Sequence, residues 1–275
     1  QISGVDLTRA LNPEQIADIR ATLLRWKVVF FRDCVLDHQQ HIDFARQFGD
    51  PTPGHVMYGN DDTYPEIYSI AKERTANRNR QQVALRPWTG WHTDITAAIN
   101  PPWASILRGD VVPPYGGDTQ WTNLAAVFAS LSEPLQKFVE TLRGVHRLAL
   151  GENELCSVHP LVRVHPETGE RVLYVSPSFI KSVVGLKAHE SHKLLELLWE
   201  QAVRPEYTVR FKWEPGSIAF WDNRSTAHLA PSDIFDSDFE RQFWRVTLVG
   251  DVPVGVDGER SEAIAGEPIG IVARN

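Results

Sequence analysis

Three strand-like runs decide the fold: YTVRFKW (207–213), SIAFW (217–221) and FWRVTLVG (243–250). Each is a short apolar or alternating run, the pattern expected of buried or half-buried strands. They dominate the last third of the chain, together with a shorter run, VVFF (28–31), near its start. Strands of this length, separated by turn-forming residues, favour an antiparallel jelly roll.

Helical patterns lie mostly before these strands or between them. Asn12 and Pro13 are suited to cap and begin the first helix. Helices are expected over residues 12–26, from Asp37 to Gly49, from Ser132 through Leu142 and over 187–203. The polar stretch 71–90 is expected to be a long loop. The chain shows no repeat or linker, which favours one domain over residues 1–275. The expected fold class is α+β, a jelly-roll (double-stranded β-helix) core with flanking helices.

The composition limits the partners. The net charge of −7 argues against a nucleic-acid or anionic-membrane surface. No apolar run approaches the ~18 residues that a membrane span needs. The two cysteines, Cys34 and Cys156, lack metal-site spacing and fit a reducing compartment. No signal peptide is visible, so a cytoplasmic protein is expected.

A histidine and an aspartate lie two residues apart in GWHTDIT (90–96), a stretch suited to a strand. Because side chains alternate across a strand, His92 and Asp94 are expected to project from one face toward a metal ion. Alone the pair is weak evidence, since it also arises by chance on a solvated face. His228 in WDNRSTAH (221–228) is the candidate third ligand. Two histidines and one carboxylate leave coordination positions open, which suits iron(II) oxygen chemistry.

The other histidines are given structural roles. Those in amphipathic helices are expected to be solvated: His38, His41, His189 and His192. Those beside prolines, His159 and His165, are expected in loops, and His146 is expected to end a helix.

Four separated motifs identify a family. WHTD (91–94), GGDTQW (116–121), WDNRSTAH (221–228) and RQFWRVTLVGD (241–251) resemble, in order and spacing, the iron(II)/2-oxoglutarate-dependent dioxygenases of the taurine dioxygenase (TauD/TfdA) superfamily. The resemblance extends from about residue 2 to about residue 255.

The resemblance implies a role for several residues. His92, Asp94 and His228 would hold Fe(II), which 2-oxoglutarate chelates through its keto oxygen and C1 carboxylate, leaving one position for O₂. Thr119 and Arg241 would bind the distal carboxylate, for which a planar guanidinium is suited.

The same resemblance suggests a substrate pocket. Arg245 matches the arginine that contacts sulfonate in taurine dioxygenases. A buried arginine also needs an anionic ligand or an acidic partner, and we expect the ligand. His55 and Tyr58 resemble a histidine and a tyrosine of the taurine pocket. Phe179 matches an aromatic pocket wall, with ordinary core packing as the alternative. Trp88 stands where taurine enzymes have an asparagine, which indicates a larger or more apolar substrate.

The expected reaction is hydroxylation of the carbon next to a sulfonate, which releases sulfite and an aldehyde together with succinate and CO₂. Within the same chemistry, VHPETGER (164–171) and LVGDVPV (248–254) look at least as much like the sulfate-ester enzymes, so an alkylsulfatase or an aryloxyalkanoate dioxygenase is the alternative. A zinc hydrolase with the same ligands and a non-catalytic jelly-roll binding module are the alternatives from other classes.

The expected partner is a small anionic organic substrate, and a dimer or tetramer is common among relatives. The segment between Leu150 and His159 is shorter than in many of those relatives. The sequence leaves open whether this shortness is a true deletion of a lid or the omission of a disordered lid.

Overall fold

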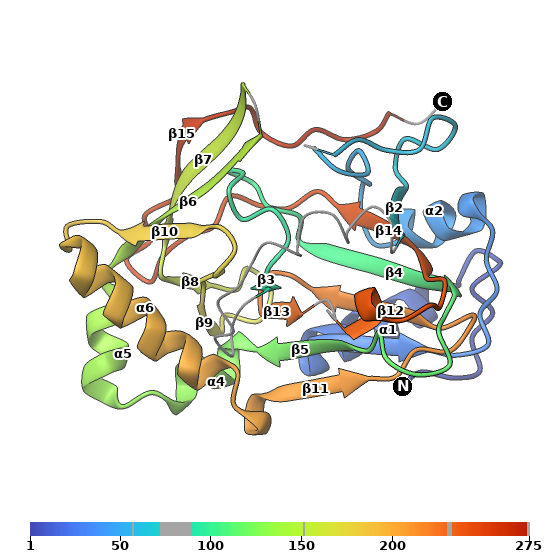
Figure 1. Ribbon diagram of the computed structural model, residues 1–275, viewed down its shortest axis with the longest axis horizontal. Coiled ribbons are helices and arrows are strands. Elements are labelled where there is room, and N and C mark those ends of the chain that lie inside the picture. Colours follow the sequence, from blue (N-terminus) through green and yellow to red (C-terminus); the bar gives the residue numbers. More distant parts are fainter. Residues whose placement is uncertain (57, 72–89, 151, 230–232, 274–275) are drawn as a thin grey trace.

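In the computed structural model, two antiparallel sheets are flanked by helices (Figure 1). The structure describes residues 1–56, 58–71, 90–150, 152–229 and 233–273. The larger sheet has the strand order β1 (Val28–Phe31), β12 (Ile218–Asp222), β4 (Ala104–Val111), β14 (Gln242–Leu248) and β2 (Tyr68–Ala71). The smaller sheet has the order β11 (Thr208–Phe211), β5 (Thr119–Asn123), β13 (Thr226–Leu229) and β3 (Trp91–His92).

An aromatic core joins the two sheets face to face. It unites Trp121 and Phe211 from the smaller sheet with Leu107, Trp221 and Phe243 from the larger one. The rings of Trp121 and Trp221 meet edge to face, with centroids 5.6 Å apart. Two antiparallel sheets closed over one core confirm the expected jelly roll with flanking helices.

A third sheet extends from the jelly roll, in the order β10 (Ile180–Val183), β6 (Arg143–Leu150), β7 (Asn153–Pro160) and β15 (Glu262–Ala265). A separate small ladder pairs β8 (Val162–Val164) with β9 (Arg171–Leu173). Strands β6 and β7 pair along their whole length, from Arg143 with Pro160 to Leu150 with Asn153.

Local capping signals explain where the first two helices begin. In α1 (Pro13–Trp26), the side chain of Asn12 accepts from the backbone N–H of Gln15, and the Gln15 side chain accepts from Asn12 in return. Asp37 and Gln40 form the same reciprocal pair at the start of α2 (His38–Arg46). That helix ends at Arg46, not at Gly49 as expected, and a turn continues to Gly49.

Three further helices, α4 (Leu124–Ser130), α5 (Glu133–Glu140) and α6 (Ala188–Ala202), share one apolar cluster with the β8–β9 ladder and β10. The short helices are η1 (Pro205–Tyr207) and η2 (Asp233–Asp236). The expected helices at 132–142 and 187–203 are therefore confirmed to within two residues. No helix among the described residues has the length and apolar character needed to cross a membrane. The expected loop at 71–90 lies almost entirely outside the described residues.

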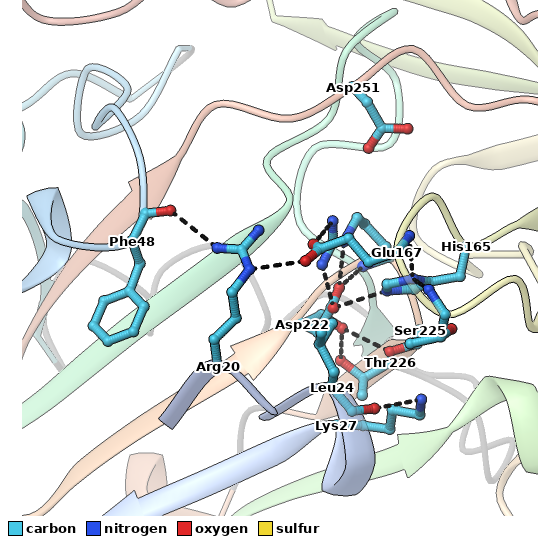
Figure 2. Close-up of polar contacts among 12 residues, drawn as sticks. Arg20, Leu24, Lys27, Phe48, His165, Glu167, Asp222, Ser225, Thr226 and Asp251 are labelled. Atoms are coloured by element: carbon cyan, nitrogen blue, oxygen red, sulfur yellow. Dashed lines mark hydrogen bonds and ion pairs between the residues drawn. The ribbon is translucent and has the colours of Figure 1, made fainter. Parts of the chain in front are cut away.

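A buried ionic network fixes the turn between β12 and β13 (Figure 2). Arg224 donates to both oxygens of the fully buried Asp222, at 2.9 and 2.7 Å, and also to Glu167 at 2.7 Å. His165 Nδ1 accepts from backbone N–H groups, so its Nε2 donates to Asp222 at 3.0 Å. The backbone oxygen of Asp222 accepts from the Thr226 hydroxyl at 2.8 Å. The network thereby sets the direction in which β13 leaves the turn.

Three histidines differ from the sequence prediction, two in their secondary structure and one in its burial. His146 lies in β6, not at a helix end, and His159 lies in β7, not in a loop. Both are fully buried, and so is His41, which was expected to be solvated. His159 Nε2 lies 2.8 Å from the carbonyl oxygen of Thr96, so burial is accompanied by hydrogen bonding.

The buried His159 makes stability depend on pH. Burial lowers its pKa from 6.5 to about 4. Between pH 6.5 and about pH 4, His159 is protonated in the unfolded chain but neutral in the folded chain. The stability that the neutral, buried His159 contributes is therefore lost as the pH falls from 6.5 to about 4. His159→Gln should flatten the dependence of unfolding free energy on pH by about 1.4 kcal/mol per pH unit. Chemical denaturation at several pH values measures the slope, and identical slopes for both proteins would contradict the assignment.

Candidate metal and co-substrate site

The three expected ligands meet between the sheets. One ligand atom from each of His92, Asp94 and His228 lies within 4.8 Å of the others. Asp94 Oδ1 is 3.9 Å from His92 Nε2 and 4.0 Å from His228 Nε2. His92 and His228 are direct partners across the β3–β13 ladder, which places their rings 4.1 Å apart. Cross-strand pairing therefore brings together two residues that are far apart in sequence.

Asp94 reaches the site differently from the way the sequence predicted. Strand β3 ends at His92, and Asp94 lies in the turn that follows. Ile95 then adopts a φ of +47°, a left-handed conformation that is rare for a β-branched residue. Strain of this kind costs about 1–3 kcal/mol and persists only where surrounding contacts impose it. The carboxylate is thus aimed by a tight turn, not by strand alternation.

Neighbouring charges keep the Asp94 carboxylate ionised. Burial alone would raise its pKa, but the charge of Arg245, with smaller contributions from the two imidazoles and the Ser105 hydrogen bond, outweighs that effect and holds the pKa of Asp94 well below its usual range. Arg245 Nη1 donates to Oδ1 at 2.6 Å, and the Ser105 hydroxyl lies 2.6 Å from Oδ2. The site therefore presents a permanent negative charge.

The two imidazoles are suited to bind a cation through Nε2. His92 Nδ1 lies 3.0 Å from the carbonyl oxygen of Gly90, which only accepts, so in the neutral ring the lone pair is on Nε2. Burial, and then the adjacent His92, lowers the pKa of His228 well below its usual value. A neutral His228 retains its lone pair at neutral pH. Two imidazole nitrogens and one carboxylate oxygen fit a divalent transition metal.

A buried arginine lies beside the second candidate element, the binding site for a distal carboxylate. Arg241 is 7% exposed, and its Nε has no hydrogen-bond partner among the described residues. Burial lowers the pKa of Arg241 to about 10, although Asp233 acts in the opposite direction, so the group stays charged at neutral pH. A buried guanidinium whose Nε–H is unsatisfied is costly, which makes an anionic ligand a natural further partner.

Aromatic residues connect Thr119 to Arg241. The guanidinium carbon of Arg241 lies 3.9 Å from the centroid of Phe243, which packs edge to face on Trp213. Trp213 Nε1 donates to the Thr119 hydroxyl at 2.9 Å. Gly117 completes this wall with a φ of +72°, and a Cβ there would lie 3.4 Å from Arg241 Nε. Thr119 and Arg241 thus belong to one buried cluster.

Arg245 has an acidic partner, where the sequence argument favoured a ligand. Its Nη1 contacts Asp94, while Nε has no partner among the described residues. The guanidinium carbon lies 5.3 Å from the ring of Tyr68, its cross-strand partner. Burial of Arg245 therefore does not by itself require a substrate anion.

The other pocket candidates are distributed around Arg245 and Asp94. His55 stacks on Tyr58 at 4.3 Å and contacts Tyr68 at 5.0 Å, which links these residues to Arg245. Phe179 packs in an apolar cluster with Ile95. Trp88 lies outside the described residues.

Sequence reasoning missed four residues of this region: Tyr68, Ser105, Trp213 and Asn223. Asn223 lies inside the motif WDNRSTAH, next to the ligand strand, and so carried a local signal. Tyr68 and Ser105 carried none, because they reach the site only through pairing with distant strands.

Comparisons with known proteins identify the family of the chain. Residues 1–247 match the family described as taurine catabolism dioxygenase TauD, TfdA family. A crystal structure of a taurine dioxygenase from Burkholderia xenovorans is 65% identical, with a TM-score of 0.90, over 97% of this chain and 91% of that one. An alpha-ketoglutarate-dependent sulfate ester dioxygenase of Pseudomonas putida is 37% identical over 95% of this chain and 89% of its own length.

A more distant relative has another substrate. An alpha-ketoglutarate-dependent 2,4-dichlorophenoxyacetate dioxygenase of Cupriavidus pinatubonensis is 29% identical over 92% of this chain and 95% of its own length. From the family match and these likenesses, the chain belongs to the TauD/TfdA family and is a 2-oxoglutarate-dependent dioxygenase.

Proposed function

We propose that the protein binds Fe(II) through His92, Asp94 and His228 and uses 2-oxoglutarate and O₂ to hydroxylate the carbon next to a sulfonate group. The observation that carries the proposal is the convergence of the three ligands on one point beside two buried arginines. When bound, the iron and its co-substrate supply the oxidation of a C–H bond, with 2-oxoglutarate converted to succinate and CO₂. The protein contributes binding, orientation and exclusion of water.

Charge balance supports an anionic substrate as well as an anionic co-substrate. A divalent cation together with Arg241 and Arg245 carries more positive charge than Asp94 cancels. A dicarboxylate at Arg241 and a monoanion near Arg245 would restore neutrality in this buried region. Thr119 adds a hydroxyl to the buried cluster that contains Arg241, and Tyr68 with His55 forms an aromatic wall beside Arg245.

The chemistry then follows from where the oxygen is inserted. One atom of O₂ enters succinate and the other enters the substrate at the carbon bearing sulfur. The hydroxyl group of that product loses its proton, the C–S bond breaks, and its electron pair leaves with sulfite. An aldehyde remains. Arg245, which lies against the candidate ligand Asp94, would bind the sulfonate and so hold the neighbouring carbon close to the three ligands.

A sulfate ester is the second candidate substrate. The Pseudomonas putida relative acts on sulfate esters, and the same arginine would hold a sulfate group equally well. The likeness to the taurine dioxygenase structure, at 65% identity, is the reason for placing sulfonates first.

The metal site can be tested without turnover. Anaerobic addition of Fe(II) and 2-oxoglutarate should produce a weak visible charge-transfer absorption band. Asp94→Ala should abolish it, because the only carboxylate of the ligand set is removed, whereas Asp18→Ala, at an exposed position of α1, should leave it intact. Turnover supported by zinc and not by iron with 2-oxoglutarate would instead establish a hydrolase.

The role of Arg241 predicts a selective defect. Arg241→Ala should raise the KM for 2-oxoglutarate roughly 10- to 100-fold, since charge-assisted hydrogen bonds contribute about 1.5–3 kcal/mol. Arg241→Lys should recover only part of this loss, because it keeps the charge but not the planar fork. Steady-state kinetics with varied 2-oxoglutarate measures the effect. A fall in kcat with an unchanged KM for 2-oxoglutarate would contradict the assignment.

A substrate panel decides the substrate class. Taurine, longer alkylsulfonates, alkyl sulfates and phenoxyacetates are compared by succinate formation, and an alkylsulfonate should give the highest kcat/KM. A preference for longer chains over taurine would agree with the tryptophan at position 88. A higher kcat/KM for alkyl sulfates would replace the sulfonate proposal with the sulfate-ester alternative.

A further inference from the structure

A chain of buried hydrogen bonds ends on the oxygen of Asp94 that faces away from the imidazoles. Asp94 Oδ2 lies 2.6 Å from the hydroxyl oxygen of Ser105, and Ser105 lies 2.8 Å from the side-chain nitrogen of Asn223. The side-chain oxygen of Asn223 in turn accepts from Trp221 Nε1 at 2.9 Å. All four side chains are at least nine-tenths buried, so water does not compete for these bonds.

The donor direction along this chain is forced. An indole N–H only donates, so Trp221 fixes the amide oxygen of Asn223 on its own side. The amide nitrogen must then donate to the Ser105 oxygen, which leaves the single hydroxyl proton of Ser105 for Asp94. The carboxylate thus receives a directed hydrogen bond on Oδ2. Oδ1, which also accepts from Arg245 Nη1 at 2.6 Å, remains toward His92 and His228.

Backbone pairing fixes the positions of these residues, and one ring contact joins them to the ligand His228. Ser105 in β4 is the direct cross-strand partner of Trp221 in β12. The backbone N–H of Asn223 donates to the carbonyl of Trp103 at 2.8 Å. The Trp221 ring lies 4.9 Å from the ring of His228, so the chain is in contact with the ligand from β13 as well as with Asp94.

We propose that Ser105 and Asn223 are positioning residues that commit Asp94 to bind the metal through Oδ1 alone. The hydrogen bond to Oδ2 prevents the carboxylate from rotating to bind the ion through both oxygens. Binding through both oxygens would occupy a coordination position that the co-substrate or O₂ needs. Asn223 acts through Ser105 by fixing the direction of its proton. The inference rests on the proposed metal site at His92, Asp94 and His228.

The test measures metal binding in the absence of 2-oxoglutarate and substrate. Co(II) serves as the probe, because its visible spectrum reports coordination geometry independently of activity. Ser105→Ala and Asn223→Ala should each weaken Co(II) affinity, roughly 10- to 100-fold for Ser105→Ala, and change the spectrum. The double variant should bind no more weakly than Ser105→Ala, because Asn223 acts through that hydroxyl.

Thr247→Val is the matched control. Thr247 is buried and lies directly opposite Ser105 on β14, but its hydroxyl bonds to Thr52 and not to a ligand. This variant should keep wild-type affinity and spectrum.

The inference is overturned if both Ser105→Ala and Asn223→Ala match the wild type in affinity and spectrum, or if Thr247→Val reproduces their defects. If Ser105→Ala does not fold, the Co(II) affinity and spectrum of Asn223→Ala alone decide whether the inference holds. Failure of the wild-type protein to bind Co(II) would refute the proposed metal site itself, a result distinct from normal binding by the variants.

Discussion

The buried negative charge of Asp94 is the constraint on which the site depends. A carboxylate that is 2% exposed is strongly destabilising unless charges and hydrogen bonds compensate it. Here Arg245 and two imidazoles surround Oδ1, and Ser105 holds Oδ2. The arrangement that compensates the buried charge also forms a cation site, because the side chains around Oδ1 include two imidazole nitrogens.

The two sheets of the jelly roll supply different side chains to the site. The smaller sheet supplies both imidazoles through the adjacent strands β3 and β13. The larger sheet supplies Ser105 from β4 and both arginines from the region of β14. Because the two faces meet across one aromatic core, ligands and counter-charges approach from opposite sides. The Asp222–Arg224 network then anchors the turn from which β13 emerges.

The sequence predicted the starts of two helices and the three candidate metal ligands, each for a physical or comparative reason. The capping pairs at Asn12 and Asp37 are local and marked two helices correctly. The motif resemblance brought His92, Asp94 and His228 together, which no periodicity would do. Where tertiary packing overrides local pattern, prediction failed: His146 and His159 became buried strand residues, and Asp94 lies beyond a strand of only two residues. The single domain, the oligomeric state and the individual roles of the site residues remain predictions.

A crystal structure of the protein grown anaerobically with Mn(II) and 2-oxoglutarate tests the central claim most directly. Anomalous scattering should place one ion within coordination distance of His92 Nε2, His228 Nε2 and Asp94 Oδ1, with Oδ2 still bonded to Ser105. The distal carboxylate of 2-oxoglutarate should contact Arg241 and Thr119. An ion bound away from these three residues, or a co-substrate whose distal carboxylate avoids Arg241, would contradict the account.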